Sequence, residues 1–384
     1  MLNFEFCCPT KVVFGKGSIA KLSELIDNDK KILMIYGGGS IMKNGVYNQV
    51  KVALNDFNMI EFGGIEPNPT YETCMEAVKI VKKEKINFLL AVGGGSVLDA
   101  TKFIAAAAKY KGEEPYDIIS KCAPFDEFIP FGSVITLPAT GSEMNANTVI
   151  SRKSTQEKLA LQSGKLYPTF SIIDPEVTFT LPTKQTVNGI VDTFVHVMEQ
   201  YATYDVNSPL QDSWALGLIK TLINESPKVL TNPKDYEARA NIFWCATCGL
   251  NFWLSCGLVQ DWATHRIGHE LTALYGLDHG QSLAIILPRL WQYKKKDKAK
   301  KLAKMARDVY GCVEKDELKA ADYTIKKTEE FFNSIGMKTK LSDYGINPQE
   351  AAKIVKERLE QRKVVFGENN DITPQVAYEV LLKC

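Results

Sequence analysis

The hydrophobic pattern divides the chain into two parts of different character. In the first part, short apolar runs of strand length alternate with longer charged segments whose apolar positions recur at helical spacing, as in residues 71–85. The apolar runs cover residues 31–36, 87–92, 132–137 and 170–174, and each ends at or beside Gly, Pro or Asp. Strands that alternate with helices predict a mainly parallel sheet covered by helices on both faces.

Beyond about Pro182 the pattern changes to long helical segments with few strand-like runs. We therefore predict an α/β domain over residues 1–180 and an all-helical domain over residues 181–384. A lysine-rich run at residues 294–304 is predicted to form the solvated side of one of these helices. The clearest helical segments lie at residues 187–203, 213–230, 237–254, 318–336 and 348–363.

Composition limits the classes of protein to which the chain can belong. Its 384 residues, 45% of them hydrophobic, suffice for two domains with separate cores. The 46 basic and 45 acidic residues balance, so no basic field indicates a nucleic-acid partner. Nine scattered cysteines, an odd number, favour free thiols in a reducing compartment. Because no signal-peptide pattern and no apolar stretch of roughly 20 residues is present, we expect a cytoplasmic protein without a membrane partner.

All four histidines of the chain fall in one stretch of the predicted helical domain. Asp192 precedes His196 by four residues, and His265 precedes His269 by four, so each pair lies on one face of a predicted helix. His279 follows just beyond a glycine that is predicted to end the second helix. One carboxylate and several imidazoles from separate elements form the ligand set of a divalent first-row metal such as iron or zinc.

More ordinary interpretations exist for these residue types. A single histidine is more often a buried hydrogen-bonding group than a ligand, and only the grouping of all four favours a metal. Cys245 and Cys248 form a CxxC, but their apolar helical surroundings and the lack of a second CxxC favour two small buried residues over a redox or metal motif.

Glycine runs follow two of the predicted strands at equivalent places. The strand ending at residue 36 is followed by Gly-Gly-Gly-Ser, and the strand ending at residue 92 by the same four residues and a predicted helix. A glycine turn between strand and helix presents backbone N–H groups to an anion and lets a phosphate approach closely. Neither run fits GxGxxG or GxxxxGK, so an ordinary Rossmann fingerprint and a Walker A loop are not supported. One run alone would be a plain turn, but two favour a nucleotide site at Gly37, Gly38, Gly39, Ser40, Gly94, Gly95 and Ser96.

A third strand end, at residues 135–151, is dense in small hydroxyl and amide side chains. Thr136, Thr140 and Ser142 suit hydrogen bonds to a ribose, a phosphate or a carboxamide. A solvated loop would have the same composition, so the neighbouring glycine runs are what favour a cofactor.

Four motifs follow one another along the chain: GGGSVLDATK at 93–102, LPATGSE at 137–143, DxxxH at 192–196 and HRIGHELTALYGLDHG at 265–280. Together they resemble the iron-containing alcohol dehydrogenase family. The likeness is greatest to its butanol dehydrogenase and NADPH-dependent aldehyde reductase branch, and it continues through residues 341–346 and 367–373. It implies an N-terminal Rossmann-like dinucleotide-binding domain and a C-terminal helical metal-binding domain, an architecture similar to that of dehydroquinate synthase.

The resemblance also implies roles for individual residues. His269 matches a further family histidine that lies near the nicotinamide and is not itself a ligand. The implied metal ligands are Asp192, His196, His265 and His279. The cofactor phosphates are expected on Gly94, Gly95 and Ser96, with Asp99 just inside the helix, and Thr136, Thr140, Ser142 and Lys158 along the rest of the cofactor groove.

Together these residues predict a metal-dependent enzyme that moves a hydride between NADP(H) and a primary alcohol or aldehyde. The metal would stabilise the alkoxide as a Lewis acid, and His269 would help to carry the proton to or from solvent. The turn at residues 37–40 holds no carboxylate that would select NAD(H), and Lys43 lies nearby, so we predict a preference for NADPH. Fe(II) is the expected metal by resemblance, with Zn(II) as the alternative.

The substrate and the assembly state are expectations from the resemblance. We expect medium-chain aliphatic aldehydes and their primary alcohols as substrates, and a homodimer. A polyol dehydrogenase of the same fold, acting on glycerol or propanediol, is the alternative enzyme. A non-catalytic nucleotide-binding protein with a structural metal is the alternative from another class, and the extra histidine beside a complete ligand set disfavours it.

Overall fold

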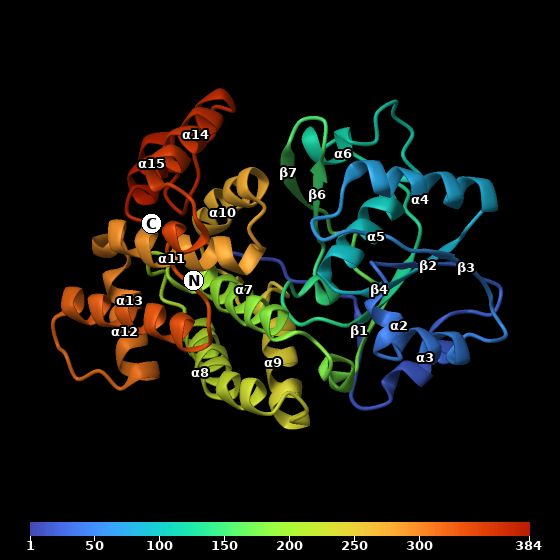
Figure 1. The fold of residues 1–384 in the computed structure, drawn as a ribbon, viewed down its shortest axis with the longest axis horizontal. Helices are drawn as coiled ribbons and strands as arrows, with labels where there is room; N and C mark the ends of the chain where they lie inside the picture. The colour runs from blue at the N-terminus through green and yellow to red at the C-terminus, as the bar shows by residue number, and fades with distance from the viewer. The chain divides into compact units, whose positions relative to one another are not determined.

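The apolar runs of the first half of the chain form one all-parallel sheet in the computed structural model, which describes all 384 residues. Six strands pair in the order β1-β8-β5-β4-β2-β3. Figure 1 labels β1, β4, β2 and β3 of this sheet. The predicted mainly parallel α/β fold is confirmed, and the four predicted strands are β2, β4, β5 and β8. The bounds are β1 (Lys11–Phe14), β2 (Lys31–Tyr36), β3 (Asn58–Phe62), β4 (Phe88–Gly93), β5 (Phe131–Ile135) and β8 (Phe170–Ile173).

Side chains of the sheet alternate between two apolar cores, one on each face. On β2, Leu33 and Ile35 belong to the core that includes α4 and α5. Ile32 and Met34, one residue out of step, belong to the core that includes α3. Because both faces are buried, the strands have continuous apolar sequences. The helices of this part are α1 (Leu22–Leu25), α2 (Ser40–Lys43), α3 (Val46–Ala53), α4 (Tyr71–Glu84), α5 (Gly95–Ala107) and α6 (Asp117–Ser120).

A short antiparallel pair that the hydrophobic pattern did not predict follows β5. Strand β6 (Asn147–Arg152) pairs with β7 (Glu157–Gln162). Many of their residues are small or polar, so neither strand is an apolar run. Pairing with the neighbouring strand is what makes these residues strands. Thr148 of β6 donates a hydrogen bond to the main-chain oxygen of Asp99 at 2.8 Å, which holds this pair against α5.

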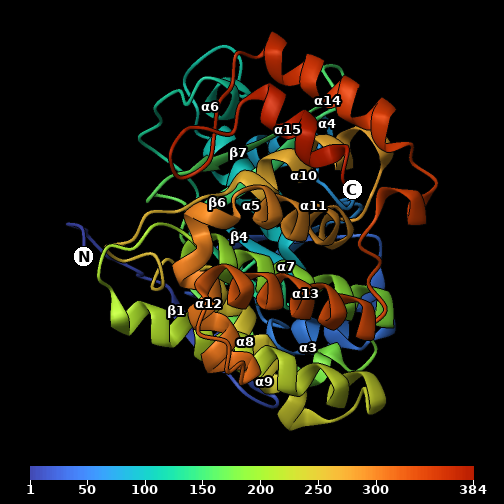
Figure 2. The ribbon, with the colours of Figure 1, turned by 90° about the vertical axis from the view of Figure 1, so that its left-hand side faces the viewer.

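The second half of the chain is helical, as predicted. Helix α7 packs against α8 and α11, α11 contacts α10 and α13, and α12 lies beside α13 (Figure 2). No helix combines the length and apolar content that a bilayer crossing requires. The bounds are α7 (Thr183–Tyr201), α8 (Pro209–Thr231), α10 (Ala263–Tyr275), α11 (His279–Tyr293), α12 (Lys295–Tyr310), α13 (Glu317–Ser334), α14 (Pro348–Gln361) and α15 (Pro374–Leu381).

The chain forms two units that are not separated by a single cut. A sheet unit comprises residues 7–181 and 233–247, and a helical unit comprises residues 1–6, 182–232 and 248–384. Most of α9 (Tyr236–Gly249) therefore belongs to the sheet unit, where Phe243 joins the core that includes α5. Helix α9 is apolar on several sides, so its sequence predicts a helix without identifying the core that it joins.

The lysine-rich run at residues 294–304 differs from its prediction. Lys298 and Lys301 on α12 are only 1% and 4% exposed. The Lys298 ammonium lies 2.9 Å from the Asp261 carboxylate and 2.8 Å from that of Glu368. These partners are distant in sequence, so the run itself carries no sign that its lysines form buried ion pairs.

Candidate metal centre and nucleotide-binding turns

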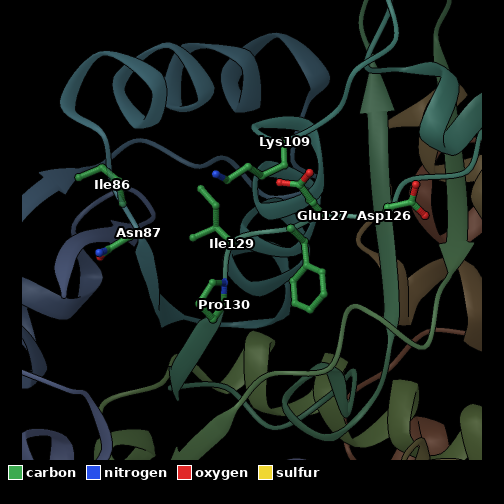
Figure 3. A pocket seen from close by; sticks show the side chains of 8 residues that line it. Ile86, Asn87, Lys109, Asp126, Glu127, Ile129 and Pro130 are labelled. Atoms are coloured by element: carbon green, nitrogen blue, oxygen red, sulfur yellow. The ribbon is translucent and has the colours of Figure 1, made fainter. Parts of the chain in front are cut away.

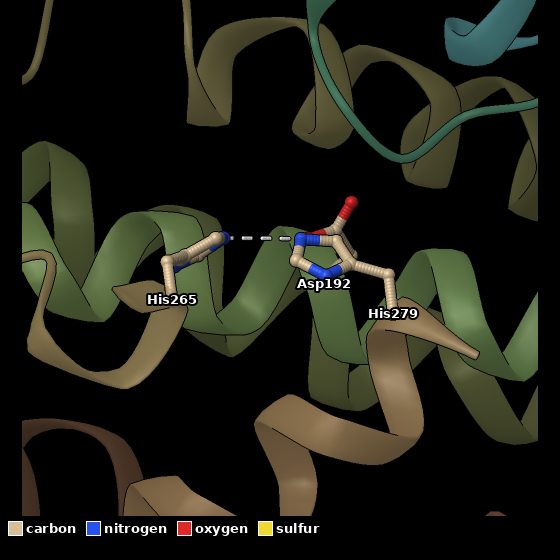
Figure 4. Close-up of side chains that lie close together, drawn as sticks. All are labelled: Asp192, His265 and His279. Carbon is tan, nitrogen blue, oxygen red and sulfur yellow. Dashed lines mark ion pairs between the residues drawn. The ribbon is translucent and has the colours of Figure 1, made fainter. Parts of the chain in front are cut away.

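Four polar side chains converge where three helices of the helical unit meet. Asp192 and His196 lie one turn apart on α7, His265 is the third residue of α10, and His279 is the first residue of α11. The Asp192 Oδ1 atom lies 3.4 Å from His196 Nε2, 3.7 Å from His265 Nε2 and 3.5 Å from His279 Nε2. Figure 4 shows Asp192, His265 and His279 directed toward one another. The structure thus brings together all four residues of the predicted ligand set.

The spacing of these atoms fits a divalent metal ion. Ligand atoms about 2.1 Å from a tetrahedral metal lie about 3.4 Å from one another, close to the three distances measured from Asp192 Oδ1. The ligand atoms of Asp192, His265 and His279 all lie within 4.8 Å of one another, and His196 joins this group of three through its 3.4 Å distance to Asp192 Oδ1. Asp192 Oδ1 and His265 Nε2 are buried and form no hydrogen bond, which is costly unless a bound ion satisfies them.

Burial and charge act against each other in this cluster. Asp192 and His196 have side chains 5% exposed and His265 has 9%, whereas His279 has 25%, so the cluster is most accessible at His279. Burial favours the neutral form of Asp192, but the imidazoles of His196 and His279 outweigh it and hold its pKa well below the usual range. Burial also opposes the charged form of His265, but the carboxylates of Glu199 and Asp192 raise its pKa to about 9. Asp192 is therefore an anion at neutral pH, the form that binds a metal.

Close packing between α7 and α11 sets the position of His279. A side chain at Gly280 would lie 2.8 Å from the main-chain oxygen of Asn188 and 2.9 Å from its Cα, so only glycine fits here. Asn188 Nδ2 donates a hydrogen bond to Asp278 at 2.8 Å, and Asp278 begins α11 with a capping box. The first residue of α11 is thereby held next to Asp192.

His269 lies next to the cluster. Its ring centre, one turn after His265 on α10, is 6.3 Å from that of His265 and 5.4 Å from that of His279. The residue is half-buried, so part of its surface is exposed to solvent.

Two residues that the sequence analysis did not identify also border the cluster. Glu199 accepts a hydrogen bond from His265 Nδ1. Trp262, directly before α10, has a φ of 62°, which is unusual for a bulky residue, and its ring centre lies 5.2 Å from that of His265. Glu199 follows Asp192 by seven residues on one helix face, a spacing that could have identified it. No pattern in the sequence marks Trp262.

The two glycine turns lie at the carboxyl ends of neighbouring strands. Strands β2 and β4 pair in parallel with Tyr36 opposite Val92, so the turns that begin at Gly37 and Gly93 are side by side. After the second turn, α5 begins at Gly95. The carboxyl ends of parallel strands, beside a helix N-terminus, are where nucleotides bind in such sheets.

Residues from the third strand end border the second glycine turn. A side chain at Gly95 would lie 2.4 Å from Thr140 Oγ1, so the loop after β5 sits directly on the start of α5. The Thr136 main-chain N–H donates to the Gly93 carbonyl at 2.9 Å. The structure therefore brings Thr136 and Thr140 to the predicted phosphate turn, where Ser96 is half-buried.

Asp99 and Ser142 form a hydrogen bond with each other inside the sheet unit. Ser142 Oγ donates to Asp99 at 2.8 Å, and the Val149 main-chain N–H donates to the same carboxylate at 3.1 Å. Burial raises the pKa of Asp99 to about 6, although the Lys102 ammonium opposes the shift. Lys102 is fully buried and donates to main-chain and side-chain oxygens of Ser142 and Asn145. These groups brace the loop that carries Thr140.

The first glycine turn is open at Gly38. A side chain at Gly38 would meet no atom within 4 Å, whereas Gly39 has a φ of 95° that favours glycine. Ser40 and Lys43 are exposed on the short helix that follows.

Lys158 on β7 donates at 2.8 Å to an asparagine side chain just before α4.

A separate hollow of the sheet unit lies at the other ends of the strands (Figure 3). It is formed by residues just before β4 and β5 together with the end of α5. Because amino and carboxyl ends of parallel strands lie at opposite edges of a sheet, this hollow is distinct from the glycine turns. Its lining residues are Ile86, Asn87, Lys109, Asp126, Glu127, Phe128, Ile129 and Pro130.

Comparison with known proteins covers nearly the whole chain. Residues 9–175 match the family described as "Iron-containing alcohol dehydrogenase", and residues 186–381 match the "Fe-containing alcohol dehydrogenase family, C-terminal". The chain is 49% identical over 382 residues to the NADPH-dependent aldehyde reductase YqhD of Escherichia coli, with 99% of both proteins covered.

Solved structures show the same relationship. A crystal structure of Escherichia coli YqhD superposes with a TM-score of 0.97 at 48% identity, covering 100% of this chain and 98% of that one. The crystal structure of NADH-dependent butanol dehydrogenase A from Thermotoga maritima superposes with a TM-score of 0.93 at 37% identity, again covering 100% and 98%. The resemblance inferred from the motifs is confirmed. The chain belongs to the iron-containing alcohol dehydrogenase family of oxidoreductases.

Proposed function

We propose that the protein interconverts aldehydes and primary alcohols, with NADP(H) as the hydride carrier and one divalent metal ion held by Asp192, His196, His265 and His279. The observation that carries this proposal is the convergence of these four side chains on one buried point. Membership of a family of alcohol dehydrogenases supports it.

The reaction moves a hydride between the nicotinamide and a carbonyl carbon, so negative charge develops on the carbonyl oxygen. A divalent cation bound at the cluster would supply Lewis acidity for that charge. Asp192 contributes the single anionic ligand, and its depressed pKa keeps it ionised. The 25% exposed side chain of His279 marks the side from which a substrate oxygen can approach.

His269 is the proposed proton carrier. It is half-buried, with its ring centre 5.4 Å from that of His279, so it can exchange protons with both the cluster and solvent. An imidazole gives and takes protons near neutral pH, which suits it to protonate the product alkoxide in reduction and to accept that proton in oxidation.

NADP(H) is proposed to bind at the strand ends of the sheet unit. Main-chain N–H groups at the start of α5 are suited to the pyrophosphate. The open Gly38 position, without a carboxylate and near Lys43, supports binding of a 2′-phosphate. The Escherichia coli relative is NADPH-dependent and the Thermotoga maritima relative NADH-dependent, so local residues must decide the preference. The proposed site comprises Gly37, Gly38, Gly39, Ser40, Gly94, Gly95, Ser96, Asp99, Thr136, Thr140, Ser142 and Lys158.

The metal and the substrate are proposed from the ligand types and the family. Fe(II) is the proposed metal because the family is iron-containing, and Zn(II) fits the same three imidazoles and one carboxylate. Medium-chain aliphatic aldehydes and their primary alcohols are the proposed substrates. The odd number of cysteines supports a cytoplasmic location.

A homodimer is also proposed. Met1, Leu2 and Phe4 are 53%, 46% and 51% exposed, an unusual set of apolar side chains to leave in water. Trp253, 43% exposed, continues this surface, and its ring centre lies 4.9 Å from that of Phe6. Contact with a second copy would bury these side chains.

The test combines metal analysis with a substrate panel. Iron and zinc are measured in the purified protein, and oxidation of NADPH is followed by absorbance with a series of aliphatic aldehydes. Reduction of NADP⁺ is followed with butanol, glycerol and propanediol. We expect one metal ion per chain and aldehyde-dependent oxidation that a chelator abolishes. Activity with diols alone would favour the polyol dehydrogenase, and metal-loaded protein inactive with every substrate would contradict the proposal.

A further inference from the structure

We infer that Glu199 is a positioning residue that fixes the tautomer and orientation of His265 and thereby sets the affinity of the metal centre. The inference rests on the proposed metal centre and goes beyond its four ligands. Glu199 lies on α7, three residues after His196 and seven after Asp192, on the face that carries both. Its side chain is only 2% exposed.

Glu199 holds the start of α10 through both its main chain and its side chain. Its main-chain oxygen accepts a hydrogen bond from the Asp261 N–H at 2.9 Å. Its carboxylate accepts from the Thr264 N–H at 2.6 Å and from the His265 N–H at 3.4 Å. The residue at the helix cap, Trp262, provides no side-chain hydrogen bond to the N–H groups of the helix start. Glu199 therefore satisfies N–H groups that the helix start would otherwise leave unpaired.

The same carboxylate also determines which ring nitrogen of His265 carries the proton. It is hydrogen-bonded to Nδ1, and because a carboxylate only accepts, Nδ1 must donate. In the neutral ring the lone pair is then on Nε2, which lies 3.7 Å from Asp192 Oδ1 and forms no hydrogen bond. A ring held in this way keeps Nε2 directed at the metal position, so the lone pair that a metal binds is on Nε2 once its proton has left.

This arrangement has a measurable consequence. Carboxylates that bind the second nitrogen of a ligating histidine contribute about 10–100-fold to metal affinity. A Glu199 that served only to cap α10 would affect stability and leave metal affinity unchanged. Metal affinity thus separates the positioning role from a structural one.

The test replaces Glu199 by glutamine, which has the same shape and can still accept from the Thr264 N–H. The dissociation constant for Zn²⁺ is measured by competition with a chromophoric chelator, and unfolding of the metal-free protein is followed in parallel. Glu199→Gln should weaken Zn²⁺ binding by about 10–100-fold. The matched control is Glu329→Gln, which removes a carboxylate paired with Arg289 at 2.5 Å in the same unit. The control should bind Zn²⁺ with the affinity of the unaltered protein.

Either of two results would overturn the inference. Equal Zn²⁺ affinity of Glu199→Gln and the unaltered protein would assign Glu199 a capping role only, with the proposed function intact. Failure of the unaltered protein to bind a divalent ion would remove the proposed function and the inference with it.

A second measurement does not depend on the folding of a variant. The chain has four histidines, so isotope-labelled histidine gives a simple ring spectrum in the zinc-loaded protein. His265, assigned through its neighbours in α10, should show a proton on Nδ1 and zinc on Nε2. Zinc on Nδ1, or a proton on Nε2, would overturn the inference.

Discussion

Replacing Gly280 by alanine should destabilise the helical unit and weaken metal binding together. The added Cβ would lie 2.8 Å from the main-chain oxygen of Asn188 and 2.9 Å from its Cα, closer than the 3.0 Å below which Cβ contacts essentially never occur. Two of the three nearest atoms belong to the backbone of α7, so side-chain rotation cannot relieve the overlap. Helix α11 must therefore move away by roughly 0.5–1 Å to restore ordinary contact.

The size of the effect follows from this overlap. Overpacking of this kind costs about 1–3 kcal/mol, and the better helix propensity of alanine offsets at most about 1 kcal/mol. With a cost of about 2 kcal/mol, the middle of that range, the net loss is about 1–2 kcal/mol, which lowers the midpoint of thermal unfolding by roughly 2–8 °C for a unit of this size. The same movement carries His279, now 3.5 Å from Asp192 Oδ1, away from the cluster.

Gly217 provides the matched control for this substitution. It lies inside α8, is exposed, and a side chain there would meet no atom within 4 Å. Gly217→Ala should stabilise the protein by up to about 1 kcal/mol and leave metal affinity unchanged. Thermal unfolding of the metal-free proteins and Zn²⁺ competition provide both measurements. A Gly280→Ala protein that matches Gly217→Ala in stability and metal affinity would refute the close approach of α7 and α11.

Three further predictions concern the cofactor, the proton and the pH. A side chain at Gly38 would meet no atom within 4 Å, so Gly38→Asp can be accommodated. Its carboxylate would repel the 2′-phosphate and should reduce the preference for NADPH. An unaltered enzyme that favours NADH by about tenfold or more would contradict this reasoning. His269→Ala should lower kcat with metal content intact, and loss of metal would instead make His269 a ligand. In the metal-free protein the pKa of His265 is raised to about 9, so its imidazolium contributes stability that is fully present below about pH 6.5 and is lost as the pH rises to about 9. Metal binding must displace that proton, so the affinity for Zn²⁺ should rise with pH up to about pH 9. Calorimetry in buffers of different ionisation enthalpy measures the released proton. A Zn²⁺ affinity that does not depend on pH would be incompatible with this linkage.

The strands that the sequence predicted are those buried on both faces. Strand β4 is buried along its whole length, so its residues form a continuous apolar run. Strand β3 lies at the sheet edge with no fully buried residue, and it has no such run. The hairpin of β6 and β7 escaped prediction because its stability comes from pairing, which local hydrophobicity does not record.

The sequence by itself determined which residues share a helix face and which chemistry they offer. Asp192 and His196 are one turn apart wherever α7 lies, because helical periodicity is a property of a single element. The resemblance to one family could also be recognised from the sequence, because each motif is a run of neighbouring residues. That likeness already included His279 among the expected ligands.

Only the tertiary structure decided which of these elements meet. His279 reaches Asp192 because Gly280 lets α11 approach α7, and Glu199 reaches His265 because the start of α10 packs on that same helix. The physical reason is that contacts between elements depend on close packing and on hydrogen bonds between residues distant in sequence. Such contacts leave no periodic trace along the chain.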